Sequence, residues 1–232
     1  MCLLFKNSVK TVSFDCGGTL YYEAEEDYIV FHRILLKLGY RFEPVEVREA
    51  LKDARLWWSR EKARTREVWN ENTWISLLRK MVSNLSIPNQ ALAEQLRDYW
   101  LSQAGFRVYE DAEHTLKKLK DSGFQLITIS NVSSSRNLAT YLRKAGLLEY
   151  FAILIASGDV GFEKPNPEIF LVASRLSKTP VEKILHVGDK YEEDYLGARA
   201  AGVNAILIDR RGRYGDKQCL KIFSLKELIS LL

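Results

Sequence analysis

The stretch that decides the fold is Thr11-Val12-Ser13-Phe14-Asp15-Cys16-Gly17-Gly18-Thr19. Its first four residues have the pattern of a short buried strand, and that strand ends abruptly at Asp15. The adjacent glycines Gly17 and Gly18 predict a tight backbone turn. Polar groups at the end of a strand mark the edge where open parallel sheets place their ligands. The stretch therefore predicts a first strand whose end carries chemistry.

The rest of the chain divides into two kinds of segment. From about residue 22 to 104 the apolar residues recur at helical spacing only, as in Tyr28, Phe31, Leu35 and Leu38. From about residue 108 onward, short apolar strands alternate with helices, which indicates βαβ units and a parallel sheet. We expect strands at 125–129, 152–156, 184–187 and 205–208, and helices at 111–121, 134–144, 167–176 and 192–201.

These segments predict an α/β protein with an insertion. The core is Rossmann-like, with a parallel sheet of five or more strands, and it comprises residues 1–20 and 105–232. An all-helical module, residues 21–104, is inserted directly after the first strand. All five tryptophans of the chain lie in this module, where large aromatic side chains on helices are usually core residues.

Composition excludes several classes of protein. The 232 residues are 47% hydrophobic and 28% charged, which is typical of a globular protein that buries a core. No apolar stretch approaches the roughly 20 residues of a membrane span, and the opening residues are too short for a signal-peptide core, so we expect a cytoplasmic protein without membrane partners. A net charge of +4 without a long basic run does not favour nucleic-acid binding. Cys2, Cys16 and Cys219 have no disulfide or zinc-site spacing, so any metal must be held by oxygen atoms.

Polar side chains follow four of the predicted strands. They are Asp15 after the first, Ser130 and Asn131 after the second, Lys164 beyond the third, and Asp189 and Asp194 after the fourth. Converging carboxylates repel one another unless a cation neutralises them, and hard oxygen ligands suit Mg²⁺. A lysine and a hydroxyl group beside such an ion would bind a phosphoryl group. The sequence thus predicts a Mg²⁺ and phosphate site at this edge of the sheet.

Four sequence motifs resemble those of the haloacid dehalogenase superfamily. They are Phe14-Asp15-Cys16-Gly17-Gly18-Thr19-Leu20, Ile129-Ser130-Asn131, Lys164-Pro165-Asn166-Pro167-Glu168-Ile169-Phe170, and Val187-Gly188-Asp189-Lys190-Tyr191-Glu192-Glu193-Asp194. Their order, spacing and strand-end context agree, and the inserted helical module resembles the type 1 cap of this superfamily. The resemblance covers nearly the whole chain and is strongest to hydrolases of the phosphatase kind.

The resemblance implies a role for each site residue. Asp15 would be the nucleophile that takes up the phosphoryl group as an aspartyl phosphate. Ser130 and the backbone amide of Asn131 would bind phosphate oxygens, and Lys164 would balance negative charge. Asp15, the backbone carbonyl of Gly17, Asp189 and Asp194 would hold Mg²⁺, with Asp194 acting directly or through the water shell of the ion. The substrate would be a small phosphorylated metabolite, and the protein a monomer or a homodimer.

Gly17 departs from the family pattern. Phosphatases of the family carry a second Asp at this position, two residues after the nucleophile, which protonates the leaving oxygen and then activates water. Loss of such general acid–base help costs about 10² to 10⁴ in rate. We therefore expect good leaving groups, such as aryl or acyl phosphates, to react more readily than sugar phosphates. Another residue close by in the sequence could supply the proton instead, and the candidates are Glu23, Glu25, Glu26 and His32.

Three other functions remain open at the level of the sequence. The first is a weakly active or non-catalytic protein that binds phosphate and Mg²⁺, which the absence of an acid at Gly17 favours. The second is a 2-haloacid dehalogenase-like hydrolase, in which Asp15 attacks carbon and the paired acids Asp189 and Asp194 have no use. The third is a phosphonatase-like hydrolase, which needs a Schiff-base lysine from the helical module, where Lys37, Lys52 and Lys62 are available.

Overall fold

The computed structural model describes residues 8–232 and divides them into two compact units. The first unit comprises the described residues up to Tyr22 together with Phe106–Leu232, and the second is the continuous segment Glu23–Gly105. Cys2 lies outside the described residues, whereas Cys16 and Cys219 are free thiols. Among the described helices, none combines the length and the apolar character that a membrane crossing requires.

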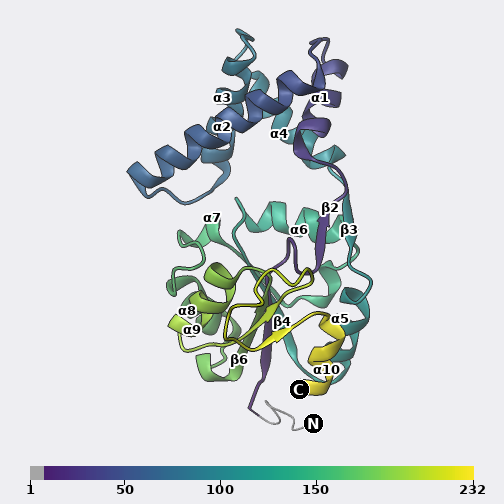
Figure 1. Cartoon of the computed structure of the whole chain (residues 1–232), viewed down its shortest axis with the longest axis vertical. Helices are drawn as coiled ribbons and strands as arrows, with labels where there is room; N and C mark the ends of the chain where they lie inside the picture. The colour runs from purple at the N-terminus through teal and green to yellow at the C-terminus, as the bar shows by residue number, and fades with distance from the viewer. Residues whose placement is uncertain (1–7) are drawn as a thin grey trace. The chain divides into compact units, whose positions relative to one another are not determined.

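A six-stranded parallel sheet forms the centre of the first unit, with the order β5-β4-β1-β6-β7-β8 (Figure 1). Its strands are β1 (Thr11–Phe14), β4 (Gln125–Ser130), β5 (Ile153–Ala156), β6 (Ile184–Gly188), β7 (Asn204–Ile208) and β8 (Lys221–Ile222). The strand β1 is central, pairing with β4 on one side and β6 on the other. The prediction of an α/β fold with a parallel sheet of five or more strands is confirmed.

Helices cover both faces of this sheet, so successive strand residues enter two different cores. On one face Val12, Leu126 and Val187 pack with α5 (Ala112–Asp121), α6 (Ser135–Lys144) and α10 (Leu228–Leu231). On the other face Ile127 and Ile184 pack with α8 (Glu168–Ser177) and α9 (Gly197–Ala200). Figure 1 shows α8 and α9 on one side of the strands and α5 and α10 on the other. The result is a three-layer unit whose strands are buried on both sides.

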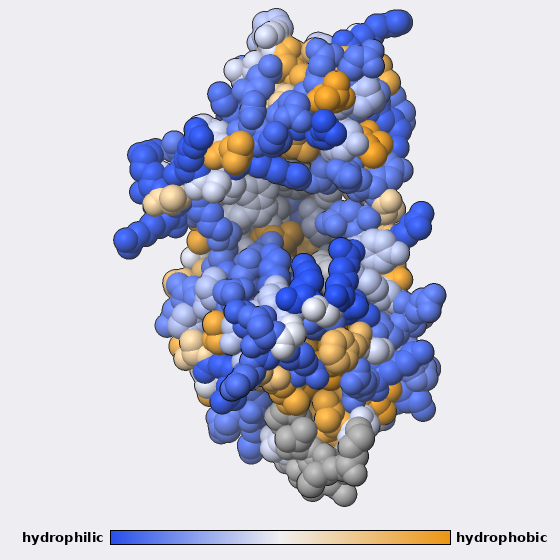
Figure 2. Space-filling model, viewed as in Figure 1, coloured by the Kyte–Doolittle hydropathy of each residue, from blue (hydrophilic) through white to orange (hydrophobic). Residues whose placement is uncertain are grey.

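The second unit consists of α1 (Asp27–Lys37), α2 (Pro44–Thr65), α3 (Glu71–Asn84) and α4 (Leu92–Gln103). The apolar stripes of the sequence form its core, in which Phe31, Leu35 and Leu51 are buried. Of the tryptophans, Trp74 and Trp100 are buried and meet edge to face, with ring centroids 5.5 Å apart. On the face shown in Figure 2, hydrophilic residues predominate on both units and apolar residues form small separate patches.

The structure corrects three details of the sequence-based expectation. The region expected to be helical only begins with a strand, β2 (Tyr21–Glu23), which pairs with β3 (Phe106–Val108) in a two-stranded sheet. The helix expected at 192–201 is a π-helical segment, η3 (Tyr191–Leu196), followed by the short α9. Strand β8 is an addition, since two residues are too few for a periodic pattern.

Candidate functional site

The candidate site lies in the first unit, at the carboxyl ends of β1, β4 and β6. Asp15 follows β1 and Asp189 follows β6, while Ser130 is the last residue of β4. Lys164 comes from the loop between α7 (Ser157–Val160) and α8, and Asp194 from η3. Because β4, β1 and β6 are adjacent and parallel, their ends meet at one edge of the sheet.

Three carboxylates converge at this edge. One oxygen each of Asp15, Asp189 and Asp194 lies within 4.8 Å of the other two. Two glycines make room for the acids. A Cβ atom at Gly18, where φ is +87°, would lie 2.7 Å from Oδ2 of Asp189, and a Cβ atom at Gly188 would lie 2.2 Å from Cγ of Asp194. Both positions therefore exclude any side chain.

Lys164 lies between two of these acids. Its Nζ atom donates to Oδ1 of Asp15 at 2.7 Å and to Oδ1 of Asp194 at 2.6 Å, and its side chain is 1% exposed. The side chain of Asn131 fixes the backbone of this lysine from both sides. It accepts a hydrogen bond from the Lys164 N–H at 2.8 Å and donates to the Lys164 carbonyl at 2.9 Å. The ammonium group is thereby held in place through its main chain.

Burial and charge shift the acidity of the central groups. Burial raises the pKa of Asp15 to about 7, and the neighbouring carboxylates Asp194 and Asp189 add to this effect while Lys164 opposes it. Burial also raises the pKa of Asp189, helped by Asp194 and opposed by Lys190 and Arg213. A divalent cation between these acids would favour their charged forms, because it would supply the positive charge that the site lacks.

The other two buried groups are held in their charged forms. For Asp194, burial alone would raise the pKa, but Lys164 and His186 hold it below the ordinary range. For Lys164, burial alone would lower the pKa, but Asp15 and Asp194 hold it above the ordinary range. A buried ion pair is retained when its geometry is good and its remaining hydrogen-bonding sites are occupied. Asp194 meets that condition, since Oδ1 accepts from Lys164 and His186 and Oδ2 accepts from the Lys190 N–H at 2.9 Å.

Asp189 differs from Asp194 because its oxygens are less occupied. Its Oδ1 atom is buried and finds no hydrogen-bond partner among the described residues. Its Oδ2 atom accepts from Nη2 of Arg213 at 3.2 Å, and the side chain of that arginine is 53% exposed. A buried carboxylate oxygen without a partner, on a residue that converges with two other acids, fits a hard divalent cation. The acidic cluster is thus able to bind a metal, with Asp15 and Asp189 as its most available ligands.

Ser130 and Gly17 lie beside this cluster. Ser130 is buried, as is Cys16, the residue after Asp15. Gly17 is exposed in the turn after β1. A Cβ atom there would have no atom of the described part of its own unit within 4 Å. The structure therefore brings Asp15, Lys164, Asp189 and Asp194 together, tethers Lys164 to Asn131, and leaves space beside Gly17.

Sequence reasoning missed two residues at the site. No role is expected for His186 from the sequence, yet this residue is fully buried and lies 3.3 Å from Asp194. Arg213 belongs to none of the four motifs, although it pairs with Asp189. Buried Asp209, just after β7, accepts hydrogen bonds from the backbone amides of Arg213 and Tyr214, which fixes the loop that carries the arginine. The sequence signal that could have indicated this loop is Asp209 at the end of a predicted strand, followed by a turn at Gly212.

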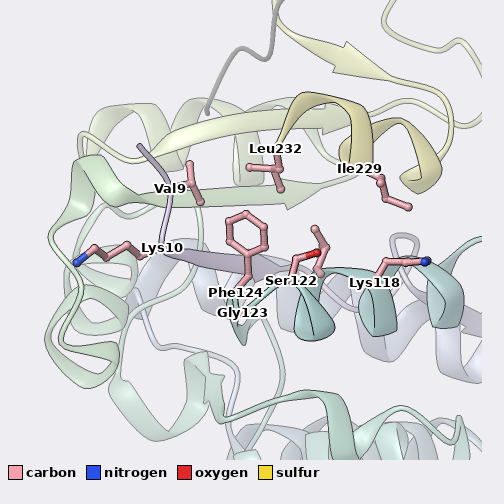
Figure 3. A pocket seen from close by; sticks show the side chains of 9 residues that line it. Val9, Lys10, Lys118, Ser122, Gly123, Phe124, Ile229 and Leu232 are labelled. Carbon is pink, nitrogen blue, oxygen red and sulfur yellow. The ribbon is translucent and has the colours of Figure 1, made fainter. Parts of the chain in front are cut away.

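A pocket of about 530 Å³ lies elsewhere in the same unit (Figure 3). Its lining includes Val9 and Lys10, which precede β1, and Gly123 and Phe124, which precede β4. These residues mark the amino-terminal edge of the parallel sheet, opposite the edge that carries Asp15. Its lining contains none of the three converging carboxylates, so this pocket is separate from the candidate site.

Comparison with known proteins agrees with the arrangement of these acids. A family model described as haloacid dehalogenase-like hydrolase matches residues 9–202. The chain belongs to this family. This match spans the stretches that carry all four motifs. The resemblance noted in the sequence is confirmed.

Several curated relatives carry more specific names. Haloacid dehalogenase-like hydrolase domain-containing protein 3 of Danio rerio is 31% identical over 67% of this chain and 63% of that protein. Glyceraldehyde 3-phosphate phosphatase of Methanopyrus kandleri is 33% identical over 50% of this chain and 48% of that protein. Phosphoserine phosphatase of Thermus thermophilus is 32% identical over 55% of each. The chain thus spans between about half and two thirds of the length of these relatives.

Solved structures of haloacid dehalogenase-like hydrolases share the fold. A 2-haloacid dehalogenase from Pseudomonas syringae superposes with a TM-score of 0.72 at 23% identity, covering 96% of this chain and 97% of that one. A HAD phosphatase from Thermococcus onnurineus gives a TM-score of 0.64 at 26% identity, covering 95% and 96%. Members with different chemistry therefore share this architecture, and the reaction has to be argued from the site.

Proposed function

We propose that this hydrolase is a Mg²⁺-dependent phosphatase of small phosphorylated metabolites that reacts through an aspartyl phosphate on Asp15. The observation that carries the proposal is the convergence of Asp15, Asp189 and Asp194 within 4.8 Å, with Lys164 bonded to two of them. The phosphatase names of two curated relatives support it. Mg²⁺ held by Asp15, Asp189, the Gly17 carbonyl and Asp194 would neutralise the acids and polarise the phosphoryl oxygens.

In the proposed reaction, a carboxylate oxygen of Asp15 attacks phosphorus. An O–P bond forms on Asp15 while the ester O–P bond breaks, and the leaving oxygen departs with the bonding electron pair as an alkoxide or phenolate. Oδ2 is the less engaged oxygen of Asp15, since Oδ1 accepts from Lys164 and Oδ2 has a single 3.5 Å contact, with the Thr19 hydroxyl group, among the described residues. Water then attacks the phosphorus of the aspartyl phosphate, the O–P bond to Asp15 breaks, and inorganic phosphate and a proton are released with the carboxylate restored.

The remaining polar groups would bind the charged phosphoryl group. Lys164 places an ammonium group beside Asp15, where it would balance the charge of the transferring oxygens. Ser130 and the backbone amide of Asn131, at the end of the neighbouring strand β4, would donate hydrogen bonds to phosphate. The side chain of Asn131 is already engaged with Lys164, so we assign it to positioning the lysine and only its amide to the substrate.

Gly17 limits which esters react well. Without an acid at this position, an alkoxide leaving group has to depart without a proton from residue 17, whereas a phenolate needs none. We therefore propose activated phosphate esters as the better substrates. The three converging acids disfavour dehalogenase chemistry, because attack on carbon has no use for a cation held by Asp189 and Asp194.

The experiment that tests this proposal is the hydrolysis of p-nitrophenyl phosphate with Mg²⁺ and with a chelator. We expect metal-dependent turnover in the natural protein and none in Asp15→Asn. Turnover that persists in Asp15→Asn would overturn the mechanism. Turnover in Gly17→Asp but not in the natural protein would favour the second candidate, a protein that binds phosphate and Mg²⁺ without catalysis.

A further inference from the structure

His186 is a buried histidine beneath the candidate site that the proposed reaction does not use. It lies in β6, two residues before Gly188, and its relative exposure is 0%. Ser13 is its register partner in the neighbouring strand β1. Both side chains face the layer of α8 and α9, where the ring of Phe170 meets the imidazole edge to face at 5.0 Å between centroids. Polar residues on this apolar face call for a reason.

Both ring nitrogens of His186 have partners. Nε2 lies 3.3 Å from Oδ1 of Asp194, and Nδ1 lies 2.9 Å from the hydroxyl oxygen of Ser13. An ionised carboxylate can only accept a hydrogen bond, so Nε2 carries the hydrogen in this contact. In the neutral ring Nδ1 is then the acceptor, and the Ser13 hydroxyl group donates to it at 2.9 Å in preference to the Leu185 carbonyl oxygen, which lies farther away at 3.4 Å. A line of hydrogen bonds thus runs from Ser13 through His186, Asp194 and Lys164 to Asp15.

We propose that His186 is a positioning residue of the phosphatase reaction, which orients Asp194 so that Lys164 is held between Asp194 and Asp15. This inference rests on the proposed function. The oxygen that receives Nε2–H is the same Oδ1 atom that binds the lysine ammonium group. Its partner Oδ2 is fixed by the Lys190 amide. Three donors therefore define the plane of the Asp194 carboxylate, and two of them are rigid.

Loss of the imidazole would change how Lys164 divides its contacts. An Asp194 carboxylate that is free to rotate would hold the ammonium group less firmly, and Lys164 would pair more closely with Asp15. When Lys164 binds Asp15 more tightly, the reactivity of the Asp15 carboxylate falls. The lysine is then also less available to the phosphoryl group. We expect kcat to fall while KM changes little, since no substrate contact is removed. Losses of this kind for residues behind a metal site are about 10- to 100-fold.

Two amide substitutions test the two ring nitrogens of His186 separately. The side-chain nitrogen of Gln is as many bonds from the backbone as Nε2, whereas that of Asn corresponds to Nδ1 and reaches only toward Ser13. We expect His186→Gln to keep kcat for p-nitrophenyl phosphate within about threefold of the natural protein. We expect His186→Asn to lower kcat by about 10- to 100-fold with KM within about threefold. Equal losses in both variants would overturn the positioning role.

Two controls distinguish positioning from stability. Phe170→Leu disturbs the ring contact with His186 and removes no hydrogen bond or ion pair of the acids, so it should leave kcat nearly unchanged at a temperature where the protein is folded. In an Asp194→Asn background, adding His186→Asn should lower kcat no further, because the histidine acts through that carboxylate. Losses from Phe170→Leu that match those from His186→Asn, or additive losses in the double variant, would contradict the inference.

The nitrogen chemical shifts of His186 test the geometry without turnover. We expect a spectrum in which Nε2 is protonated and Nδ1 is a hydrogen-bond acceptor. A ring protonated at Nδ1 alone would overturn the inference, because Nε2 could not then donate to Asp194. If the natural protein shows no turnover of p-nitrophenyl phosphate, both the proposed function and the positioning role fail. Turnover with equal losses in the two amide variants removes the positioning role only.

Discussion

Lys164 and Asp15 form a buried ion pair between residues 149 positions apart, with Nζ 2.7 Å from Oδ1. The lysine also binds Asp194 at 2.6 Å, so one ammonium group separates two carboxylates that would otherwise face each other. Because the three groups are almost completely removed from water, their charges are weakly screened. The stability of the site and its proposed chemistry therefore depend on the same group, the ammonium group of Lys164.

Removal of the Lys164 ammonium group should destabilise the protein strongly in the absence of metal. Lys164→Met leaves Asp15 and Asp194 without their shared partner, and breaking a buried pair costs about 3 to 5 kcal/mol. We expect a loss of that size in the free energy of unfolding, measured by urea denaturation in a chelator. Lys190→Met is the matched control, because Lys190 pairs with Glu193 at the surface and should cost less than about 1 kcal/mol. Similar losses in both variants would refute this view of Lys164.

An acid placed at residue 17 should raise activity toward poor leaving groups. A side chain at Gly17 meets no atom of the described part of its unit within 4 Å, so Gly17→Asp should change the free energy of unfolding by less than about 1 kcal/mol. Hydrolysis of alkyl phosphates should rise by about 10² or more, with a smaller effect on p-nitrophenyl phosphate. Rates measured against leaving-group pKa would show a shallower slope in the variant.

Gly18→Asp provides the contrast for this substitution. The backbone at Gly18 is left-handed, and its Cβ atom would collide with Asp189. The same acid moved by one residue should therefore abolish activity and weaken metal binding. Equal behaviour of the two variants would mean that the turn after β1 does not have the described geometry.

Binding of Mg²⁺ should strengthen between pH 6 and pH 8. In the metal-free protein burial raises the pKa of Asp15 to about 7 from its ordinary value of 3.8, so protons compete with the ion below neutral pH. A group with that pKa predicts an apparent affinity about tenfold weaker at pH 6 than at pH 8. Thermal unfolding at several Mg²⁺ concentrations measures it. In Asp15→Asn this dependence on pH should disappear, and its persistence would assign the proton to another group.

The raised pKa of Asp15 has the opposite effect on the metal-free protein, whose stability it lowers as the pH rises. A carboxyl group with a raised pKa binds its proton more tightly in the folded state than in the unfolded state. Its contribution to stability is present below pH 3.8 and is lost as the pH rises through about 7. Asp194, whose pKa is lowered by Lys164 and His186 against the effect of burial, contributes in the other direction and loses its stabilising effect at acid pH. The Mg²⁺ titrations should therefore be compared at each pH with a metal-free reference.

Substitution of Arg213 should tighten metal binding. The guanidinium group binds Oδ2 of Asp189, so this carboxylate has one oxygen engaged with a cationic side chain and one, Oδ1, without a partner among the described residues. Arg213→Gln frees Oδ2, and because the arginine is half exposed we expect a modest gain of about two- to fivefold in Mg²⁺ affinity by calorimetry. Arg211→Gln removes a neighbouring exposed charge as a control. A weaker affinity in Arg213→Gln would indicate that the arginine supports Asp189 instead of competing for it.

Much of this fold could be predicted because its strands are short apolar runs that glycines and polar turn residues separate. Thr11–Phe14 was predicted to the residue, and β4, β5, β6 and β7 to within one residue at each end, since a buried parallel strand gives a continuous apolar signal. Strand β8 escaped because its two residues owe their pairing to β7, not to their own pattern. The π-helical turn at Tyr191–Leu196 escaped because helical periodicity does not show an extra residue in a turn.

The acids of the site were visible in the sequence, but their partners were not. Each acid stands at a strand end, and strand ends of a parallel sheet converge. The role of His186 depends on β6 lying next to β1, so that it faces Ser13, and on η3 turning Asp194 back over the strand. Arg213 depends on a loop whose shape is set by Asp209. Both are facts of strand order and loop geometry that a local pattern does not contain.

The central position of β1 has a consequence for how the protein is made. During synthesis this strand leaves the ribosome well before one of its two sheet neighbours, β6, which begins at residue 184. The intervening helical segment Glu23–Gly105 is continuous in the chain and has its own buried core, so it is able to fold while β1 still lacks that neighbour. Nascent chains that stop before β6 would expose an apolar strand edge, a substrate for chaperones, and would carry Asp15 without Asp189.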